Sequence, residues 1–434
     1  MGETDVIAPP HVQSWYAHTA NAYTPAPPLR GDVQCEALVI GGGFTGLNAA
    51  LDLAARGIDT VLVEAARVGW GASGRNGGQI VNGFAPGPAD LTALVGRGLS
   101  DDLHRMADEA VDLLVDRITR HAINCDLRWG YRLLAVRRGH VDALKAYADE
   151  LAAHDRPVGP LLDGAAIQAH VASARVRGGL EIGRSGQLHP LNYALGLAQA
   201  ARAAGVRVFE GSAVTAIAEG PPVVAVTQGG RITAKMAALA GNAYLPGLSP
   251  TIATSLLPRI MPVGTFMLAT APLGADRARA LMPSLQAVAD INFVLNYFRV
   301  SADHRLLFGG GVSYAAAQTD AHKAALRRQM LGYFPDLADV PIDHFWGGHV
   351  AITINRFPDM GWIAPHIVYA HGFSGQGVAL TGLAGRLMAD AMAGTAGRFD
   401  MMAKIPHRRF PGGRALRMPA LVLAMLWYRL RDLI

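Results

Sequence analysis

The sequence is poor in cysteine, lysine and long apolar runs. Its two cysteines, Cys35 and Cys125, lack the spacing of a metal site, so we expect no metal and a reducing, cytoplasmic location. Only four of the 39 basic residues are lysines, and the basic residues form no long run, so the formal charge of +5 does not indicate nucleic-acid binding. The N-terminus has no continuous apolar stretch, and the apolar run at 419–428 is too short to span a bilayer. We therefore expect neither a secretory signal nor an integral membrane segment.

Glycine, in contrast, is abundant, at 50 of 434 residues, and much of it is clustered. Clustered glycine indicates places where the backbone approaches a ligand closely or adopts a positive φ. The first cluster lies between an apolar strand predicted at 37–40 and a helix predicted at 47–56. A second strand is predicted at 60–64. Together these elements form one βαβ unit.

Gly41, Gly43 and Gly46 fit the pattern G-x-G-x-x-G at the turn between the first strand and its helix. In this pattern the glycines permit a tight turn, a close approach to a pyrophosphate, and packing of helix on strand. Glu64 ends the next strand, where a carboxylate accepts hydrogen bonds from ribose hydroxyls. We interpret the unit as a dinucleotide site, because a purely structural glycine turn does not explain Glu64.

Two further glycine-rich segments indicate FAD rather than a nicotinamide cofactor. Residues 71–79 read GASGRNGGQ, and such a second loop suits a cofactor that lies against backbone over a long path. Residues 371–378 read HGFSGQGV and precede a helix predicted at 379–392, whose N-terminus suits the electron-rich edge of a reduced flavin. The predicted cofactor-binding residues are Gly41, Gly43, Phe44, Thr45, Gly46, Glu64, Ala65, Arg67, Gly71, Ala72, Ser73, Asn76, Gly77, Gly78, Gln79, Phe373, Ser374, Gly375, Gln376, Gly377 and Val378.

Elsewhere, βα segments alternate with a module that is expected to be an antiparallel sheet. The first 30 residues, rich in proline and small polar residues, are expected to lie on the surface as an extended leader. Helices are predicted at 88–122, 141–154 and 190–205, and strands at 131–137, 206–209, 265–270, 297–300 and 367–370.

The chain resembles the D-amino-acid-oxidase-like flavoproteins, the family that includes sarcosine and glycine oxidases. The segments that carry the resemblance are GASGRNGGQ at 71–79, GQLHPLNYALGLAQAARAAGV at 186–206, NYFRVSADHRLLFGGG at 296–311, FWGGHVAITINRFPDMG at 345–361 and GFSGQGVALTGLAG at 372–385. The segment FPGGRALRMPAL at 410–421 favours the gamma-glutamylputrescine oxidase branch.

The resemblance implies an α/β fold with a discontinuous, Rossmann-like FAD-binding domain and an antiparallel α+β substrate domain. It adds Val214, Gly241 and Asn242 to the expected cofactor contacts. Two departures matter: Gln376 stands where relatives often carry histidine, and no cysteine follows Cys125, so the FAD is expected to be non-covalent. The expected division is 1–30 for the leader, 31–90, 180–250 and 346–400 for the FAD-binding domain, 91–179 and 251–345 for the substrate domain, and 401–434 for a C-terminal segment.

The implied activity is oxidation of a primary or secondary amine to an aldehyde, with release of ammonia or an amine. A gamma-glutamylated polyamine is the leading substrate, and oxygen the leading electron acceptor, although another acceptor stays open. Two alternatives remain: oxidation of N-methyl or small amino acids, and a non-catalytic, flavin-binding partner protein. The sequence leaves the oligomeric state open. Lys323 and Lys404 are the only lysines beyond residue 240, and this scarcity argues against a lysine-assisted oxygen site.

Amine oxidation by a flavin requires a neutral amine, which costs about 4 kcal/mol at pH 7.4 for an alkylamine with a pKa of about 10.4. A dry, aromatic site favours the neutral amine, and aromatic rings also hold the cation in transit. Trp346, Tyr297 and Phe373 are the aromatic candidates, and His349 is a candidate proton acceptor. Simple core packing is the alternative for each.

Arg299 and Arg356 are candidates for holding a substrate carboxylate, because a guanidinium fork suits that geometry. An internal ion pair is the alternative for both. The basic residues near the end, Arg408, Arg409, Arg414 and Arg417, are expected to form a solvated surface, and the apolar residues 421–428 are expected to pack on their own domain.

Overall fold

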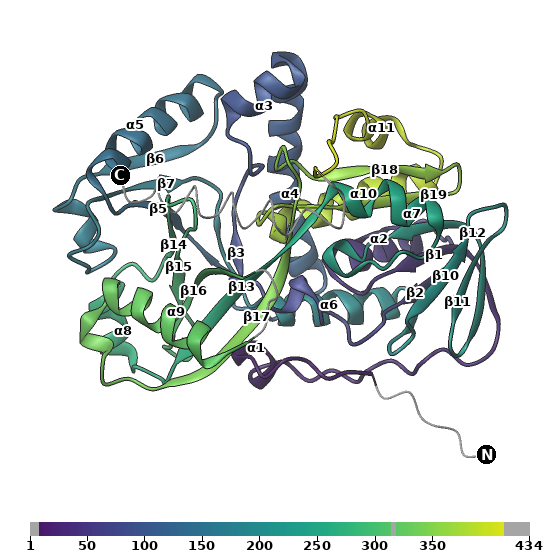
Figure 1. Cartoon of the computed structure of the whole chain (residues 1–434), viewed down its shortest axis with the longest axis horizontal. Helices are drawn as coiled ribbons and strands as arrows, with labels where there is room; N and C mark the ends of the chain where they lie inside the picture. The colour runs from purple at the N-terminus through teal and green to yellow at the C-terminus, as the bar shows by residue number, and fades with distance from the viewer. Residues whose placement is uncertain (1–7, 314–317, 412–434) are drawn as a thin grey trace.

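Two eight-stranded mixed sheets organise the chain, one in each half of the molecule as drawn in Figure 1. The structure is a computed structural model that describes residues 8–313 and 318–411. Among these residues, no helix is long and apolar enough to cross a membrane. Arg408 and Arg409 are exposed as predicted, whereas Arg414, Arg417 and residues 421–428 lie outside the described residues.

The first sheet has a parallel centre and contains the predicted βαβ unit. Its parallel strands are β1 (Val33–Ile40), β2 (Thr60–Val63), β9 (Arg207–Phe209), β12 (Gly230–Leu239) and β19 (Ile367–His371). The antiparallel strands β10 (Val214–Ala218), β11 (Val223–Thr227) and β18 (Asp359–Ala364) extend it. Because three distant stretches of sequence supply its strands, the nucleotide domain is discontinuous, as predicted.

Two helices, α2 (Phe44–Ala55) and α10 (Gly377–Met392), pack on this sheet. Two further helices, α4 (Arg97–Arg120) and α6 (Pro190–Ala203), pack on α10 and α2, respectively. Helix α4 packs on α10 and forms a buried ion pair from Arg117 to Asp52 of α2. Since we assigned residues 91–179 to the substrate domain, the placement of α4 differs from that expectation. The predicted helix at 88–122 is two helices, α3 (Pro88–Val95) and α4, because Gly96 between them has a φ of 83°.

The second sheet is antiparallel except where β14 pairs with β5. In spatial order its strands are β17 (Ile342–Ile352), β13 (Met261–Thr270), β16 (Leu306–Ser313), β15 (Tyr297–Val300), β14 (Ala287–Asp290), β5 (Tyr131–Ala135), β7 (Gly178–Ile182) and β6 (Val158–Leu162). Helices α5 (Arg138–Ala153), α8 (Ala275–Leu281) and α9 (Asp320–Tyr333) lie beside it in Figure 1. A third, small sheet contains β3 (Gln79–Ile80), β8 (Gly186–Gln187) and β4 (Arg128–Trp129), in that order.

Two predicted boundaries fall inside strands of the second sheet. The boundary at 346 cuts β17, which continues to Ile352 along β13, and the boundary at 180 cuts β7. The leader also differs from its prediction, because Trp15 and Tyr16 of the short helix α1 (Trp15–His18) are buried, at 2% and 0% exposed. Apolar aromatic rings in an otherwise polar leader pack under the second sheet instead of lying on the surface.

Candidate active site

A cavity of about 510 Å³ lies between the two sheets and collects the glycine-rich segments of the sequence. From the nucleotide half it is lined by the ends of β1 and β2, the start of α2, the loop at 70–79 and the start of α10. From the other half it is lined by residues of β13, β15, β16 and β17. The cavity therefore joins the predicted cofactor site to a second region formed by the antiparallel sheet.

The first glycine turn is shaped by close backbone contacts. A Cβ on Gly46 would lie 2.0 Å from the carbonyl oxygen of Gly41, so α2 packs on β1 only with glycine there. Gly41 has a φ of 117°, which favours glycine. Ser73 of the second glycine loop accepts a hydrogen bond from the Phe44 N–H at 2.9 Å. The two loops are thus joined at the N-terminus of α2, which favours an anionic group.

Glu64 lies at the end of β2 and lines the cavity. Its carboxylate accepts hydrogen bonds from the N–H groups of Gly42, at 2.7 Å, and Ala66, at 2.9 Å. Burial raises the pKa of Glu64, and these two N–H donors act in the opposite direction. The carboxylate is therefore fixed beside the glycine turn, where ribose hydroxyls are bound in this motif.

The second glycine loop is folded by its own side chains. Asn76 donates to the carbonyl oxygens of Ala72 and Ser73, and accepts from the Gly78 N–H at 2.7 Å. Gly77 faces Tyr297, whose ring would be 2.7 Å from an added Cβ. This loop is thereby pressed against β15 of the other half.

The C-terminal glycine loop reaches the cavity between β19 and α10. Gly372 has a φ of 73° and donates its N–H to the Asn242 side chain at 3.0 Å, while the Ser374 N–H donates to the Ala351 carbonyl at 3.0 Å. The side-chain oxygen of Gln376 is buried and has no hydrogen-bond partner in the described part of the chain. An unsatisfied polar atom at the cavity wall beside a helix N-terminus suits a polar ligand edge.

Most of the predicted cofactor residues line this cavity, so the residues present fit FAD. Those that line it are Gly41, Gly43, Phe44, Thr45, Glu64, Ala65, Gly71, Ala72, Ser73, Asn76, Gly77, Gln79, Val214, Gly241, Asn242, Phe373, Ser374, Gly375, Gln376, Gly377 and Val378. Gly46, Arg67 and Gly78 are not among its lining residues. Gly46 packs on Gly41, Arg67 lies 3.7 Å from the Glu210 carboxylate, and Gly78 packs on Leu188 and Arg299.

The candidate catalytic residues separate into two groups. Tyr297 and Phe373 line the cavity, and burial raises the pKa of Tyr297, which keeps its hydroxyl neutral. Trp346 is fully buried behind the glycine loop and donates its Nε1–H to the Arg75 carbonyl at 2.9 Å. His349 is not a lining residue; its ring packs on Tyr244, and burial lowers its pKa. Neither Trp346 nor His349 is among the residues that line the cavity.

The two candidate arginines also separate. Arg356 lines the cavity. Arg299 is buried outside the lining and donates to the carbonyl oxygens of Gly77, at 2.8 Å, and Leu188, at 3.0 Å. The Arg299 guanidinium therefore binds carbonyl oxygens of the chain's own backbone. It is neither a residue of the cavity wall nor part of an ion pair within the described chain. Among the described lining residues, Glu64 and Arg356 are the only charged ones.

The loop between β14 and β15 was not predicted to belong to the site, but it contributes Phe293, Val294 and Leu295 to the cavity wall. The buried Asp290 carboxylate holds this loop by accepting from the Asn292 and Asn296 side chains, at 2.6 and 2.8 Å, and from Tyr333. The signal was present as an aspartate and two asparagines close to apolar strands. Tyr131 and Tyr244 also line the cavity and had no local motif.

The fold and the cavity define a flavoprotein oxidoreductase. The chain matches the family described as FAD dependent oxidoreductase over residues 36–391, and it belongs to that family. It is accordingly an FAD-dependent oxidoreductase, with a Rossmann-like FAD-binding domain.

Individual relatives fit this assignment. The chain is 41% identical to gamma-glutamylputrescine oxidoreductase of Escherichia coli (strain K12) over 422 residues, which cover 97% of this chain and 98% of that protein. It is 38% identical over 427 residues to a probable oxidoreductase of Haemophilus influenzae, with 97% of each chain covered. Glycine oxidase from Geobacillus kaustophilus superposes with a TM-score of 0.73 at 21% identity, over 87% of this chain and 100% of that one. L-proline dehydrogenase from P. horikoshii superposes with a TM-score of 0.72 at 19% identity, over 86% of this chain and 96% of that one. The solved structures support the fold.

We predict that FAD is released intact by acid or heat. Cys35 and Cys125 are buried, neither lines the cavity, and burial raises their pKa to about 11 and about 12, so neither thiol is a reactive thiolate near a flavin. The check is the absorption of the supernatant after precipitation of the yellow protein. Colour that stays with the precipitated chain would contradict non-covalent binding.

Proposed function

We propose that the protein oxidises a primary or secondary amine that also carries a carboxylate, with a gamma-glutamylated polyamine as the leading substrate. The observation that carries this proposal is the charge of the cavity wall. On the side of the second sheet, the described lining has one charged side chain, Arg356, among apolar and aromatic residues. A guanidinium fork at this wall suits a carboxylate on the substrate, and the apolar remainder of the wall disfavours an ammonium ion.

FAD supplies a two-electron acceptor for the hydride equivalent that leaves the carbon beside the nitrogen. The chain's own residues bind, orient and dehydrate the substrate. Arg356 is proposed to bind the carboxylate, and Tyr297 and Phe373 to exclude water from the reacting amine. Loss of the hydride and of the N–H proton converts the amine to an imine, which water hydrolyses to an aldehyde and ammonia or a released amine. Transfer of the two electrons to oxygen would give hydrogen peroxide.

The proposal also draws on the relative that is 41% identical, whose name gives gamma-glutamylputrescine as its substrate. The alternative, oxidation of N-methyl or small amino acids, draws on the fold shared with glycine oxidase. Both substrate classes carry a carboxylate. The two classes differ in the distance between the carboxylate and the amine that is oxidised.

Anaerobic reduction of the holoenzyme tests these functions together. Gamma-glutamylputrescine, putrescine, sarcosine and glycine are each mixed with the enzyme, and bleaching of the flavin absorption is followed. We expect gamma-glutamylputrescine to bleach the flavin fastest. Fastest bleaching by sarcosine or glycine would favour the alternative, and no bleaching by any of them would favour a non-catalytic flavoprotein. Peroxide formed on admitting air then tests oxygen as the acceptor.

Replacing Arg356 with Gln should raise KM for gamma-glutamylputrescine by about ten- to a hundred-fold, because a hydrogen bond to a charged group contributes roughly 1.5–3 kcal/mol. KM for putrescine, which has no carboxylate, should change little. Arg231→Gln is the matched control, since Arg231 is exposed on β12 in the other sheet. Equal increases in KM for both amines would exclude a carboxylate contact at Arg356.

A further inference from the structure

Residues 8–30, here called the N-terminal strap, run along the lower edge of the molecule in Figure 1. The strap turns at α1, below β17, and returns to β1. None of its residues lines the cavity. Its buried aromatic residues and side-chain hydrogen bonds nevertheless tie it to both halves of the protein.

On the nucleotide side, the strap is fixed by backbone N–H groups. Ala26 donates to the buried Glu210 carboxylate at 2.7 Å, and Leu29 donates to the Ser212 hydroxyl at 2.8 Å. Glu210 also accepts from the Val68 N–H, just before the second glycine loop. The strap is thereby attached to the walls of the nucleotide site.

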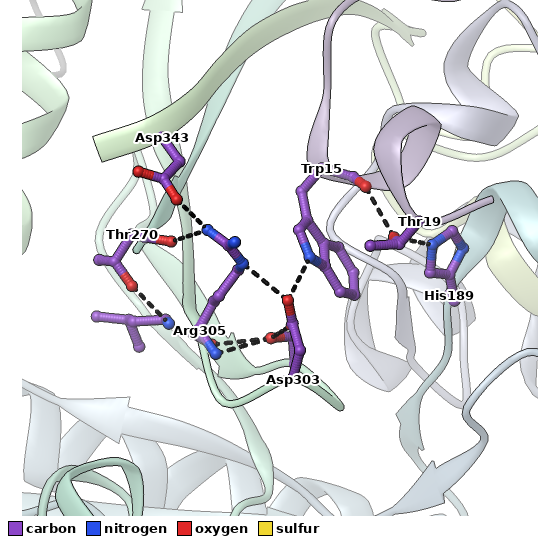
Figure 2. Close-up of polar contacts among 9 residues, drawn as sticks. Trp15, Thr19, His189, Thr270, Asp303, Arg305 and Asp343 are labelled. Atoms are coloured by element: carbon purple, nitrogen blue, oxygen red, sulfur yellow. Dashed lines mark hydrogen bonds and ion pairs between the residues drawn. The ribbon is translucent and has the colours of Figure 1, made fainter. Parts of the chain in front are cut away.

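On the other side, Figure 2 shows α1 attached to the second sheet. The Trp15 Nε1–H donates to Asp303 at 3.2 Å, and Asp303 also accepts from Arg305, which donates to Asp343 and to the Thr270 carbonyl. In the same view, Thr19 donates to the Trp15 carbonyl and contacts the His189 ring. Trp15 is therefore held from both its backbone and its ring.

Tyr16, the next residue, is fully buried and contacts two side chains that support the second glycine loop. Its ring lies 5.3 Å from the Trp346 ring, and its hydroxyl accepts from Arg299 at 3.1 Å. Trp346 donates to the Arg75 carbonyl, and Arg299 donates to the Gly77 carbonyl. Tyr16 is thus the common neighbour of both supports.

The hydroxyl of Tyr16 matters because Arg299 is a buried cation. No carboxylate of the described chain lies within ion-pair distance of Arg299, and its guanidinium donates hydrogen bonds to the carbonyls of Gly77 and Leu188 and to the Tyr16 hydroxyl. If the Tyr16 hydroxyl is removed, one N–H of the buried Arg299 cation loses its acceptor, which destabilises the folded protein. The second glycine loop, which Arg299 holds, cannot move toward the cavity without a clash, since Gly77 is already packed tightly against Tyr297.

We propose that Tyr16 is a positioning residue of the FAD site, acting through Arg299 and Trp346 on the carbonyls of Gly77 and Arg75. The N-terminal strap is then a functional part of the cofactor site although it lies outside the cavity. This inference goes beyond the proposed function, because it concerns how the flavin is held and is independent of the amine that is oxidised.

The test is Tyr16→Phe in the full chain, which keeps the ring packed on Trp346 and removes the acceptor for Arg299. We expect the Kd for FAD, measured from the fluorescence of flavin released on dilution, to rise about five- to fifty-fold. The visible absorption bands of the bound flavin should also shift, because its surroundings change. Tyr23→Phe is the matched control: it removes the same hydroxyl from the same strap near Glu210 and Arg202, and should leave both readouts unchanged.

An unchanged Kd and spectrum in Tyr16→Phe would overturn the proposal, even if the variant melts at a lower temperature. If that variant does not fold, Arg299→Lys takes its place, since a lysine keeps the charge and the buried Tyr16 ring but cannot bond the Tyr16 hydroxyl and the Gly77 and Leu188 carbonyls together. A rise in the FAD Kd of a few-fold in Arg299→Lys supports the proposal, and an unchanged Kd overturns it.

Discussion

Replacing Glu64 with Gln is expected to raise the Kd for FAD by about five- to a hundred-fold, because each unsatisfied buried polar group costs roughly 1–3 kcal/mol. Both carboxylate oxygens of Glu64 accept hydrogen bonds from backbone N–H groups, of Gly42 and Ala66. A glutamine presents one NH₂ where an acceptor is needed, so it opposes an N–H of the glycine turn and loses an acceptor for the ribose. Dilution of the holoenzyme, followed by flavin fluorescence, measures the change.

Glu36→Gln is the control for this substitution. Glu36 lies on β1 of the same sheet, and its carboxylate pairs with Lys235 at an exposed position. The FAD Kd of this variant should match that of the unmodified protein. An unchanged Kd in Glu64→Gln would show that the end of β2 does not carry the adenosine ribose.

A second large effect is expected in the pH dependence of flavin reduction at limiting substrate. If the neutral amine reacts, the rate should rise about tenfold per pH unit and level off near the pKa of the substrate, about 10.4 for an alkylamine. Between about pH 7 and pH 10 the increase is therefore several hundred-fold. The observed pKa should follow the basicity of the amine when substrates are compared.

The enzyme's own groups should add no limb to this profile near pH 6–7. His349 is outside the cavity lining, and burial and then the Arg75 charge lower its pKa. Burial raises the pKa of Tyr131 and Tyr297 in the wall, so both stay neutral across the range. His349→Ala should leave the profile unchanged. A flat profile from about pH 6 to 10 would instead mean that the ammonium form binds and loses its proton to a group of the enzyme.

The cofactor half of the site could be predicted from sequence because its signals are local. Gly41 and Gly46 lie five positions apart and contact each other, and Glu64 follows on the next strand. Glycine is required wherever a Cβ would clash with the backbone, so the residues of the turn themselves indicate its conformation. The same holds for the loop before α10.

The other half depends on contacts between distant residues. Arg299 and Gly77 are 222 positions apart, and Trp346 and Arg75 are 271 apart. An arginine in a strand has the same local pattern whether it binds a substrate or a backbone carbonyl, so only the folded chain separates the two. The contacts of Tyr16 could not be predicted for the same reason, since Arg299 and Trp346 lie far from it in the sequence.

The order of strands in the nucleotide sheet has a consequence for synthesis of the protein. Strand β1 is made early, but its neighbour β12 and the helix α10 that covers α2 are made much later. Leu38, Val39 and Leu47, which are fully buried in the finished sheet and its helix, therefore gain the last of their neighbours only after most of the chain has been made. Folding that joins such distant segments is slow and exposes apolar surface to aggregation. Newly made chains can thus complete their flavin-binding cavity only after Gly377 has been translated.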